Sequence, residues 1–195
     1  MPFGTLRDIL ITRYRLAASS KISNETTATP PIDPTSETEL VSFSCDIAEA
    51  MTYITARKFS HPVLSTRKVL LTERGRCKLY DIYPTEMAIF KIDEECPPVA
   101  WLAPETIFIK EYSCASDIWN FAVVLWEIFS LGDIPDKGMS QAQVEKNIKQ
   151  FVHLHRPPCC PEAIYSLMLS CWATLTRERP KFENIKIQLF NLIKS

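Results

Sequence analysis

The residues of this chain that could carry out chemistry include seven cysteines and three histidines. The cysteines are odd in number and irregularly spaced, a pattern that predicts neither a disulfide framework nor a zinc site. The adjacent Cys159 and Cys160 could form a redox-active or metal-binding pair, although we favour plain buried or surface thiols. His153 and His155 are predicted to lie on the surface, and no histidine has a carboxylate or cysteine at ligand spacing. These residues therefore predict no metal site.

Length and charge limit the class of protein further. A chain of 195 residues is expected to form one domain with one sizeable core. Its 22 basic and 23 acidic residues nearly cancel, which argues against a dedicated binder of nucleic acid or membrane surfaces. The first ten residues, MPFGTLRDIL, lack the extended apolar region of a signal peptide, so we expect a cytoplasmic, reducing setting. No transmembrane segment is expected.

A central buried helix is predicted around residues 121–131, the longest strongly apolar run, which is too short to span a bilayer. Ser116 and Asp117 stand just ahead of this run as candidate helix-start residues. A second helix should begin at the capping-box pattern of residues 36–39 and carry an apolar stripe on one face. The stripe consists of Leu40, Phe43, Ile47, Met51 and Ile54.

The remaining pattern predicts a mostly α fold with one short β-hairpin. The hairpin should pair residues 68–72 with residues 77–80 across a short polar turn. A short amphipathic helix is predicted over residues 4–16. Prolines mark the ends of three further helices, predicted over residues 140–151, 161–171 and 182–193.

Two motifs near the central helix resemble the protein kinase family in its tyrosine-kinase form. Residues 98–105 read PVAWLAPE and are similar to the end of a kinase activation segment. Residues 116–121 read SDIWNF and are similar to the start of the large helix in the kinase C-terminal lobe. The two motifs also follow each other at the family's spacing. The resemblance therefore implies a protein-kinase-like C-terminal lobe.

The same resemblance divides the chain into three parts. Residues 3–6, FGTL, resemble the exit from the kinase hinge, so residues 1–17 should hold the hinge exit and the first C-lobe helix. Residues 18–36 are rich in Ser, Thr and Pro and are predicted to be a disordered insert. Residues 37–195 should form the remainder of the lobe. We expect the N-terminal lobe to be absent from this chain.

The resemblance places a catalytic loop at residues 61–68, HPVLSTRK. Active members of the family carry His-Arg-Asp-Leu, three residues and then Asn, where the Asp accepts the substrate proton and the Asn holds a metal ion. His61 and Arg67 fit the scaffold positions of this pattern. Val63 replaces the base and Lys68 replaces the Asn. A valine cannot accept a proton, and an ammonium repels a metal cation.

The family's magnesium-binding Asp-Phe-Gly stands here as Asp81-Ile82-Tyr83. Asp81 is therefore a residual metal position, while Tyr83 removes the glycine that lets this loop change conformation. Leu70 matches the adenine floor, but no Gly-rich phosphate loop with a paired lysine precedes it. We therefore expect no cofactor, neither ATP nor magnesium. We also predict that Lys68 pairs with Asp81, the alternative being a lysine that points into solvent.

Other matching residues have structural roles in the family. The resemblance implies that Glu105 and Arg179 form a buried ion pair, and that Asp117 accepts hydrogen bonds from the catalytic-loop backbone. Trp119 and Trp172 match aromatic residues of the core. Their presence predicts that the fold is kept although the chemistry is not.

These observations predict a catalytically inactive tyrosine-kinase-like domain, a pseudokinase, that acts as a signalling scaffold or regulatory binding module. Two alternatives stay open: the C-lobe portion of a protein tyrosine kinase that binds ATP and phosphorylates tyrosine, and a kinase-derived helical interaction domain. The expected partners are proteins, such as another kinase or an N-terminal lobe that would cover apolar surface near Leu70 and Leu71. Nucleic acid is not expected as a partner. The chain could be the intracellular part of a longer membrane receptor.

Overall fold

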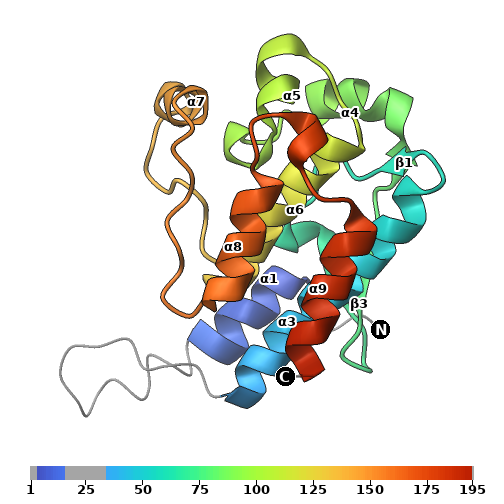
Figure 1. Cartoon of the computed structure of the whole chain (residues 1–195), viewed down its shortest axis with the longest axis vertical. Helices are drawn as coiled ribbons and strands as arrows, with labels where there is room; N and C mark the ends of the chain where they lie inside the picture. The colour runs from blue at the N-terminus through green and yellow to red at the C-terminus, as the bar shows by residue number, and fades with distance from the viewer. Residues whose placement is uncertain (1–3, 16–33, 195) are drawn as a thin grey trace.

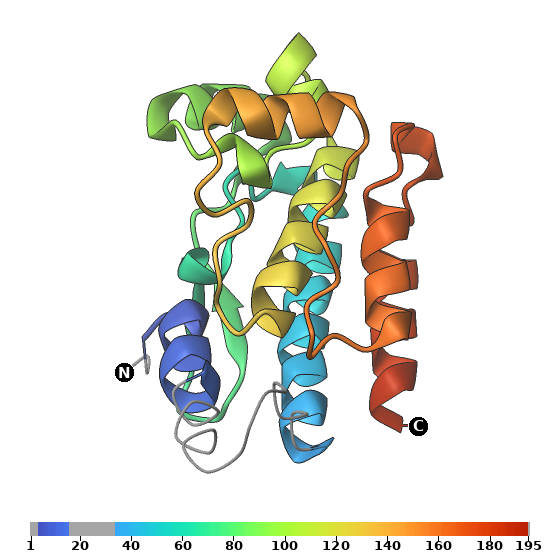
Figure 2. The same ribbon diagram turned by 90° about the vertical axis from the view of Figure 1, so that its left-hand side faces the viewer.

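A computed structural model describes residues 4–15 and 34–194 of the chain, and Figure 1 shows its arrangement. Four helices run alongside one another through the body of the molecule: α3 (Pro34–Thr55), α6 (Cys114–Phe129), α8 (Glu162–Cys171) and α9 (Phe182–Lys194). At one end lie α4 (Ala88–Glu95), α5 (Pro104–Ile109) and α7 (Gln141–Lys149) (Figure 2). The predicted mostly α fold with a short β-hairpin is confirmed.

Helix α6 is the centre of the core, as its apolar run predicts. Thirteen of its residues are buried, from Ser116 to Phe129 with the exception of Trp126. It begins at Cys114 rather than after Asp117, because Ser113 caps it: the Ala115 N–H donates to Ser113 Oγ at 3.2 Å. The Ser113 N–H donates in turn to Ser116 Oγ, also at 3.2 Å. Ser116 and Asp117 therefore belong to the first turn, and the predicted start was too late.

Helix α3 carries the predicted stripe, and all five stripe residues are buried against α6 and α9. The helix begins at Pro34, two residues before the predicted capping box, since proline is readily accepted in a first helical turn. Residues 34–36, which we predicted to be part of the insert, are therefore helical. The rest of the predicted insert lies outside the described residues.

The predicted hairpin is present. Strand β2 (Val69–Leu71) pairs antiparallel with β3 (Cys77–Leu79), with Leu70 opposite Lys78. Leu71 is buried, contrary to the exposed apolar surface that we expected there. The reason is the segment before α1: the Leu71 N–H donates to the Gly4 carbonyl at 3.2 Å, and Thr5 pairs with Leu70. Leu70 itself is half-buried.

The predicted helix over residues 4–16 divides into two parts. Helix α1 (Leu6–Ile9) opens with a capping box between Thr5 and Asp8, and a π-helix, η1 (Leu10–Arg15), follows it. Leu6 and Leu10 are fully buried. Gly132, which follows α6 with φ +81°, packs against this segment, and a Cβ on it would lie 2.9 Å from Ile11 Cγ1.

Several short elements were not predicted from the sequence. Strand β1 (Phe59–Ser60) pairs antiparallel with β4 (Tyr83–Pro84), which brings the start of residues 61–68 next to the segment after Asp81. Single 3-10 turns occur at η3 (Thr66–Lys68), η4 (Thr85–Met87), η5 (Val99–Trp101) and η6 (Thr176–Glu178). Helix α4 is the longest of the unpredicted elements.

No helix among the described residues is long and apolar enough to cross a bilayer.

Candidate functional site

The loop at residues 61–68 is held at both ends by carboxylates of helix α6. At its start, the His61 N–H donates to Asp117 Oδ1 at 3.0 Å. Near its end, the Thr66 N–H and hydroxyl donate to the two oxygens of Glu127 at 3.0 and 2.9 Å. Ten residues separate Asp117 from Glu127 along α6, about 15 Å of helix, so one rigid element sets the length and shape of the loop.

Glu127 also links the loop to the segment before α5, because Trp101 Nε1–H donates to Glu127 Oε2 at 3.1 Å. Burial raises the pKa of Glu127, although its hydrogen bonds from Thr66 and Trp101 oppose that effect. The sequence analysis missed this residue. A usable signal existed: a carboxylate inside an otherwise apolar run must find donors when it is buried.

Two titratable groups at the start of the loop are fully buried. Burial raises the pKa of Asp117 to about 7, against hydrogen bonds from Tyr112 and from the His61 backbone. Tyr112 Oη–H donates to Asp117 Oδ1 at 2.8 Å. Burial also lowers the pKa of His61 to about 4, and neither ring nitrogen has a hydrogen-bond partner among the described residues. His61 is therefore a neutral imidazole at pH 7, in line with the predicted buried scaffold role.

At the other end of the loop, Lys68 lies between two carboxylates. Its Nζ is 2.5 Å from Asp81 Oδ2 and 3.2 Å from Glu95 Oε2, and the three side chains are only 25%, 30% and 29% exposed. Burial alone would lower the pKa of Lys68, but the hydrogen bonds that Lys68 donates to Asp81 and Glu95 outweigh burial and raise it. The predicted contact between Lys68 and Asp81 is present, and the solvent-exposed alternative is wrong. Glu95 is an addition that the sequence did not predict.

Two other predicted loop residues, Val63 and Arg67, take no part in the contact between Lys68 and Asp81. Val63 is half-buried and has an aliphatic side chain at the position of the family's base. The Arg67 side chain is exposed, and its carbonyl accepts a hydrogen bond from Tyr80 Oη–H at 3.2 Å. The structure thus brings Lys68 and Asp81 together and leaves Arg67 outside the cluster.

Glu105 and Arg179, 74 residues apart, form a two-pronged ion pair. Arg179 Nη1–H and Nη2–H donate to the two Glu105 oxygens at 2.7 and 2.9 Å, and the Arg179 side chain is fully buried. Burial alone would raise the pKa of Glu105, but the bonds and charge of Arg179 outweigh it and hold the pKa below the ordinary value. Arg179 Nη1–H also donates to the Ala115 carbonyl at 2.8 Å. The pair therefore ties the start of α5 to the start of α6.

The two predicted core tryptophans lie beside this pair. Trp119 and Trp172 are 5% and 2% exposed, and their ring centroids are 6.5 Å apart. The Arg179 guanidinium lies 5.1 Å from the Trp119 centroid. His153 was predicted to lie on the surface; it is half-buried, and its ring stacks on Trp172 with centroids 5.6 Å apart. His155 is exposed, as predicted.

The cysteines contribute no reactive site to the part of the chain that the structure describes. All seven are free thiols. Burial raises the pKa of Cys159, and it raises the pKa of Cys160 to about 12, so both keep their protons at neutral pH. Within residues 4–15 and 34–194, no group of three His, Cys, Asp or Glu could hold a metal ion.

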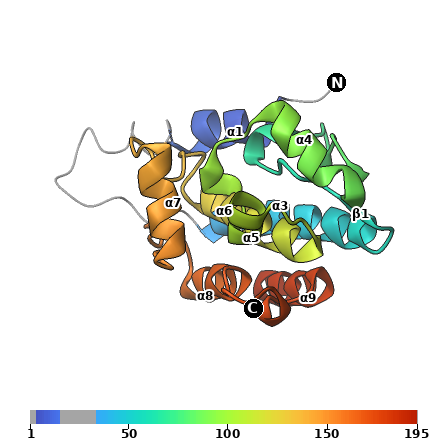
Figure 3. The same cartoon turned by 90° about the horizontal axis from the view of Figure 1, so that it is seen from above.

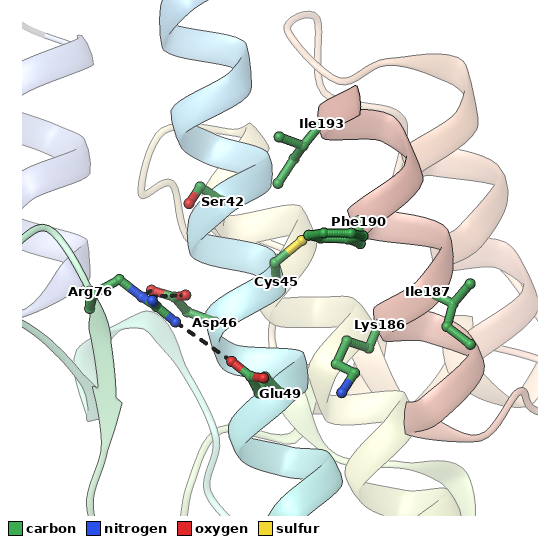
Figure 4. Close-up of a pocket in the computed structure, with 9 residues that line it drawn as sticks. All are labelled: Ser42, Cys45, Asp46, Glu49, Arg76, Lys186, Ile187, Phe190 and Ile193. Atoms are coloured by element: carbon green, nitrogen blue, oxygen red, sulfur yellow. Dashed lines mark hydrogen bonds and ion pairs between the residues drawn. The ribbon is translucent and has the colours of Figure 1, made fainter. Parts of the chain in front are cut away.

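A groove of about 500 Å³ lies away from the loop, between α3, α9 and the β2–β3 hairpin (Figure 4). One wall is apolar, with Phe190 beside the thiol of Cys45. Across the groove, Arg76 Nε lies 2.8 Å from Asp46 Oδ1 and its guanidinium also reaches Glu49 at 3.6 Å. Arg76 thus faces two carboxylates, and Lys186 of α9 is the second basic residue that lines the groove. The sequence analysis gave no indication of this groove.

Comparison with known proteins identifies the family. A family model described as protein tyrosine and serine/threonine kinase matches residues 1–189. The chain belongs to this kinase family. It is similar to the human tyrosine-protein kinase FRK, with 35% identity over 161 residues, and to the mouse protein-tyrosine kinase 6, with 37% identity over 150 residues. It is also 33% identical over 160 residues to the tyrosine kinase receptor Cad96Ca of Drosophila melanogaster.

These matches cover most of this chain but only part of each relative. They span 78%, 75% and 80% of the chain, against 32%, 33% and 21% of the relatives in the same order. The chain thus covers about a third of the relatives' length or less. The family and the tyrosine-kinase character of the relatives agree with the resemblance that the two motifs around α6 carry.

Proposed function

We propose that this chain is a catalytically inactive, tyrosine-kinase-like domain that acts by binding protein partners. The observation that carries the proposal is the contact of 2.5 Å between Lys68 Nζ and Asp81 Oδ2. In an active family member the residue at position 68 would be a metal-binding Asn. Here the ammonium itself neutralises the remaining metal-binding carboxylate. Val63, at the place of the base, has no atom that accepts a proton.

The residues present do not suit a magnesium ion. Magnesium requires oxygen ligands in a near-octahedral arrangement. Of the two side chains that would supply them, Lys68 offers only N–H donors, and Asp81 is already paired with that lysine. We therefore propose that the chain does not take up a magnesium nucleotide in the family's manner.

The retained scaffold favours a second candidate, a domain that still transfers phosphate. Asp81, the Glu105–Arg179 pair and the Asp117 contact to the loop backbone all match the family's structural pattern. The relatives are named tyrosine kinases. This candidate requires a base other than residue 63 and phosphate-binding residues from outside the described chain.

Partner binding is supported by apolar residues that lie on the surface. Ile187 and Phe190 of α9 are 56% and 51% exposed, and both line the groove between α9 and α3. Contiguous apolar surface of this kind often marks a protein contact. Seven free thiols fit a cytoplasmic setting.

Nucleotide binding with and without magnesium tests the proposal. Titration of ATP into the purified chain, followed by calorimetry, should give no heat of binding that depends on magnesium. The matched variant is Lys68→Asn, which restores an oxygen ligand beside Asp81 and should regain weak magnesium binding without phosphate transfer, since Val63 is unchanged. Magnesium-dependent ATP binding by the parent chain at micromolar affinity would contradict the proposal.

A further inference from the structure

Helix α4 ends in three consecutive carboxylates, Asp93, Glu94 and Glu95, at the negative end of its helix dipole. Its last turn contains no basic residue. Three acidic side chains at this position oppose helix formation, because they repel each other and the exposed backbone carbonyls. The helix therefore depends on positive charge supplied from elsewhere.

Each carboxylate has its own lysine. Glu94 pairs within the helix with Lys91 at 2.5 Å. Asp93 pairs at 2.9 Å with Lys110, the residue that ends α5, and both partners are more than half exposed. Glu95 pairs with Lys68 at 3.2 Å. This last contact is the most buried of the external pairs, so salt screens it least.

Apolar packing holds α4 weakly. Only Ala88 and Ile92 of its eight residues are buried, whereas Phe90 is 59% exposed. A hollow of about 330 Å³ lies between the end of α4, α5 and α7. These three helices lie at one end of the molecule (Figure 2), and Figure 3 shows them from above. Ile92, Asp93 and Cys96 border the hollow. Because α4 has only two buried residues and borders a hollow, it makes few apolar contacts with the rest of the domain. Its ion pairs with Lys68 and Lys110 therefore contribute more to holding it in place.

We propose that the ion pair between Glu95 and Lys68 holds α4 in place and keeps the Lys68 ammonium enclosed between Asp81 and Glu95. We call this ion pair the latch. The charge count supports this: Asp81 and Glu95 together outweigh the single ammonium by one negative charge. A phosphate group approaching Lys68 would have to displace Glu95 and would meet that excess. If the ion pair between Glu95 and Lys68 broke, α4 would lose this attachment and the Lys68 ammonium would become accessible to an anion. The inference deepens the proposed function and rests on it for its consequence, the exclusion of phosphate.

Hydrogen–deuterium exchange in peptides covering residues 88–96 tests the latch. The variant is Glu95→Gln, and the matched control is Glu94→Gln, which removes the same charge from the same end of the helix. Glu94→Gln also removes the ion pair with Lys91, but that pair lies within the helix and joins it to no other element. A helix held only by contacts within itself should therefore respond alike to the two changes. The latch predicts a difference: exchange in Glu95→Gln about two- to fivefold faster than in the parent chain and in Glu94→Gln.

A second variant, Lys68→Met, should also speed exchange in residues 88–96, although the substitution lies outside α4. If this variant does not fold, the comparison of the two Gln variants still decides the matter. Exchange in Glu95→Gln no faster than in Glu94→Gln would overturn the latch. Exchange reports no nucleotide or phosphate chemistry, so phosphate transfer by the parent chain would refute the proposed function and leave this result standing.

Discussion

The Lys68 ammonium lies 2.5 Å from the Asp81 carboxylate. The backbone of Asp81 at this point has a φ of +60°, in the left-handed region. Aspartate tolerates this left-handed region better than most residues, yet it still carries some cost. The next segment turns directly into strand β4, where Tyr83 stands in place of the family's glycine. The ion pair therefore lies at a left-handed backbone position, two residues before the place of the family's glycine.

We predict that Lys68→Met destabilises the chain by at least ~1 kcal/mol, because it leaves Asp81 and Glu95 partly buried without a cation. Urea unfolding at pH 7 measures the change. The control is Lys137→Met, since Lys137 is 65% exposed and lies 3.9 Å from Asp133, and its effect should stay within about 0.5 kcal/mol. Equal effects of the two substitutions would show that the Lys68 cluster adds no stability.

Arg179→Ala should be far more damaging, with a loss of about 3–5 kcal/mol, because Glu105 would keep a buried charge without a partner. The substitution also removes donors to the Ala115 and Ala173 carbonyls. Thermal or urea unfolding checks this value. Arg177→Ala, two residues earlier at an exposed position, is the matched control and should change stability little. A small effect of Arg179→Ala would mean that the pair is dispensable to the fold.

The pH dependence of stability should contain two opposing contributions. His61, with its pKa lowered from 6.5 to about 4, binds fewer protons when folded, so its contribution is present above pH 6.5 and is lost as pH falls through about 4. Asp117, with its pKa raised from 3.8 to about 7, does the reverse: its contribution is present below about pH 3.8 and is lost as pH rises through about 7. The pH ranges over which the two groups act nearly coincide, so their opposite effects on the free energy of unfolding should largely cancel.

Single variants should separate the two contributions. Relative to the parent chain, Asp117→Asn should gain stability as pH rises from about 4.5 to 6.5, because only the His61 contribution remains. His61→Gln should lose stability over the same range. Each slope should approach about 1.4 kcal/mol per pH unit, the limit for one proton. Urea unfolding at three pH values measures both, and slopes of the same sign would contradict the assignment.

The sequence predicted most of the fold because its strongest signals were local. The stripe on α3 and the apolar run of α6 need only helical periodicity, and both proved to be core. Helix α4 was missed because eight residues give little periodicity and its three acidic residues argue against a helix end. Two of the lysines that pair with these acidic residues, at positions 68 and 110, lie outside the helix, so no local pattern reveals them.

The candidate site was predicted unevenly for the same reason. The Lys68–Asp81 contact followed from the resemblance, because two family positions point into one small volume. The contributions of Glu127 and Glu95 depend on residues brought together by the tertiary fold. The stacking of His153 was not predicted because its partner, Trp172, lies 19 residues away along the chain. The sequence therefore indicated which residues had changed from the family pattern, and the structure indicates what they now contact.

The central claim, that this domain does not transfer phosphate, is tested most directly by incubating the purified chain with radiolabelled magnesium-ATP and a generic tyrosine peptide. An Asp81→Ala variant, prepared in the same way, reports any contaminating kinase. We predict incorporation no higher than in a boiled control, and equal in the two proteins. Incorporation by the parent chain that exceeds the boiled control and is lost in Asp81→Ala would contradict the account.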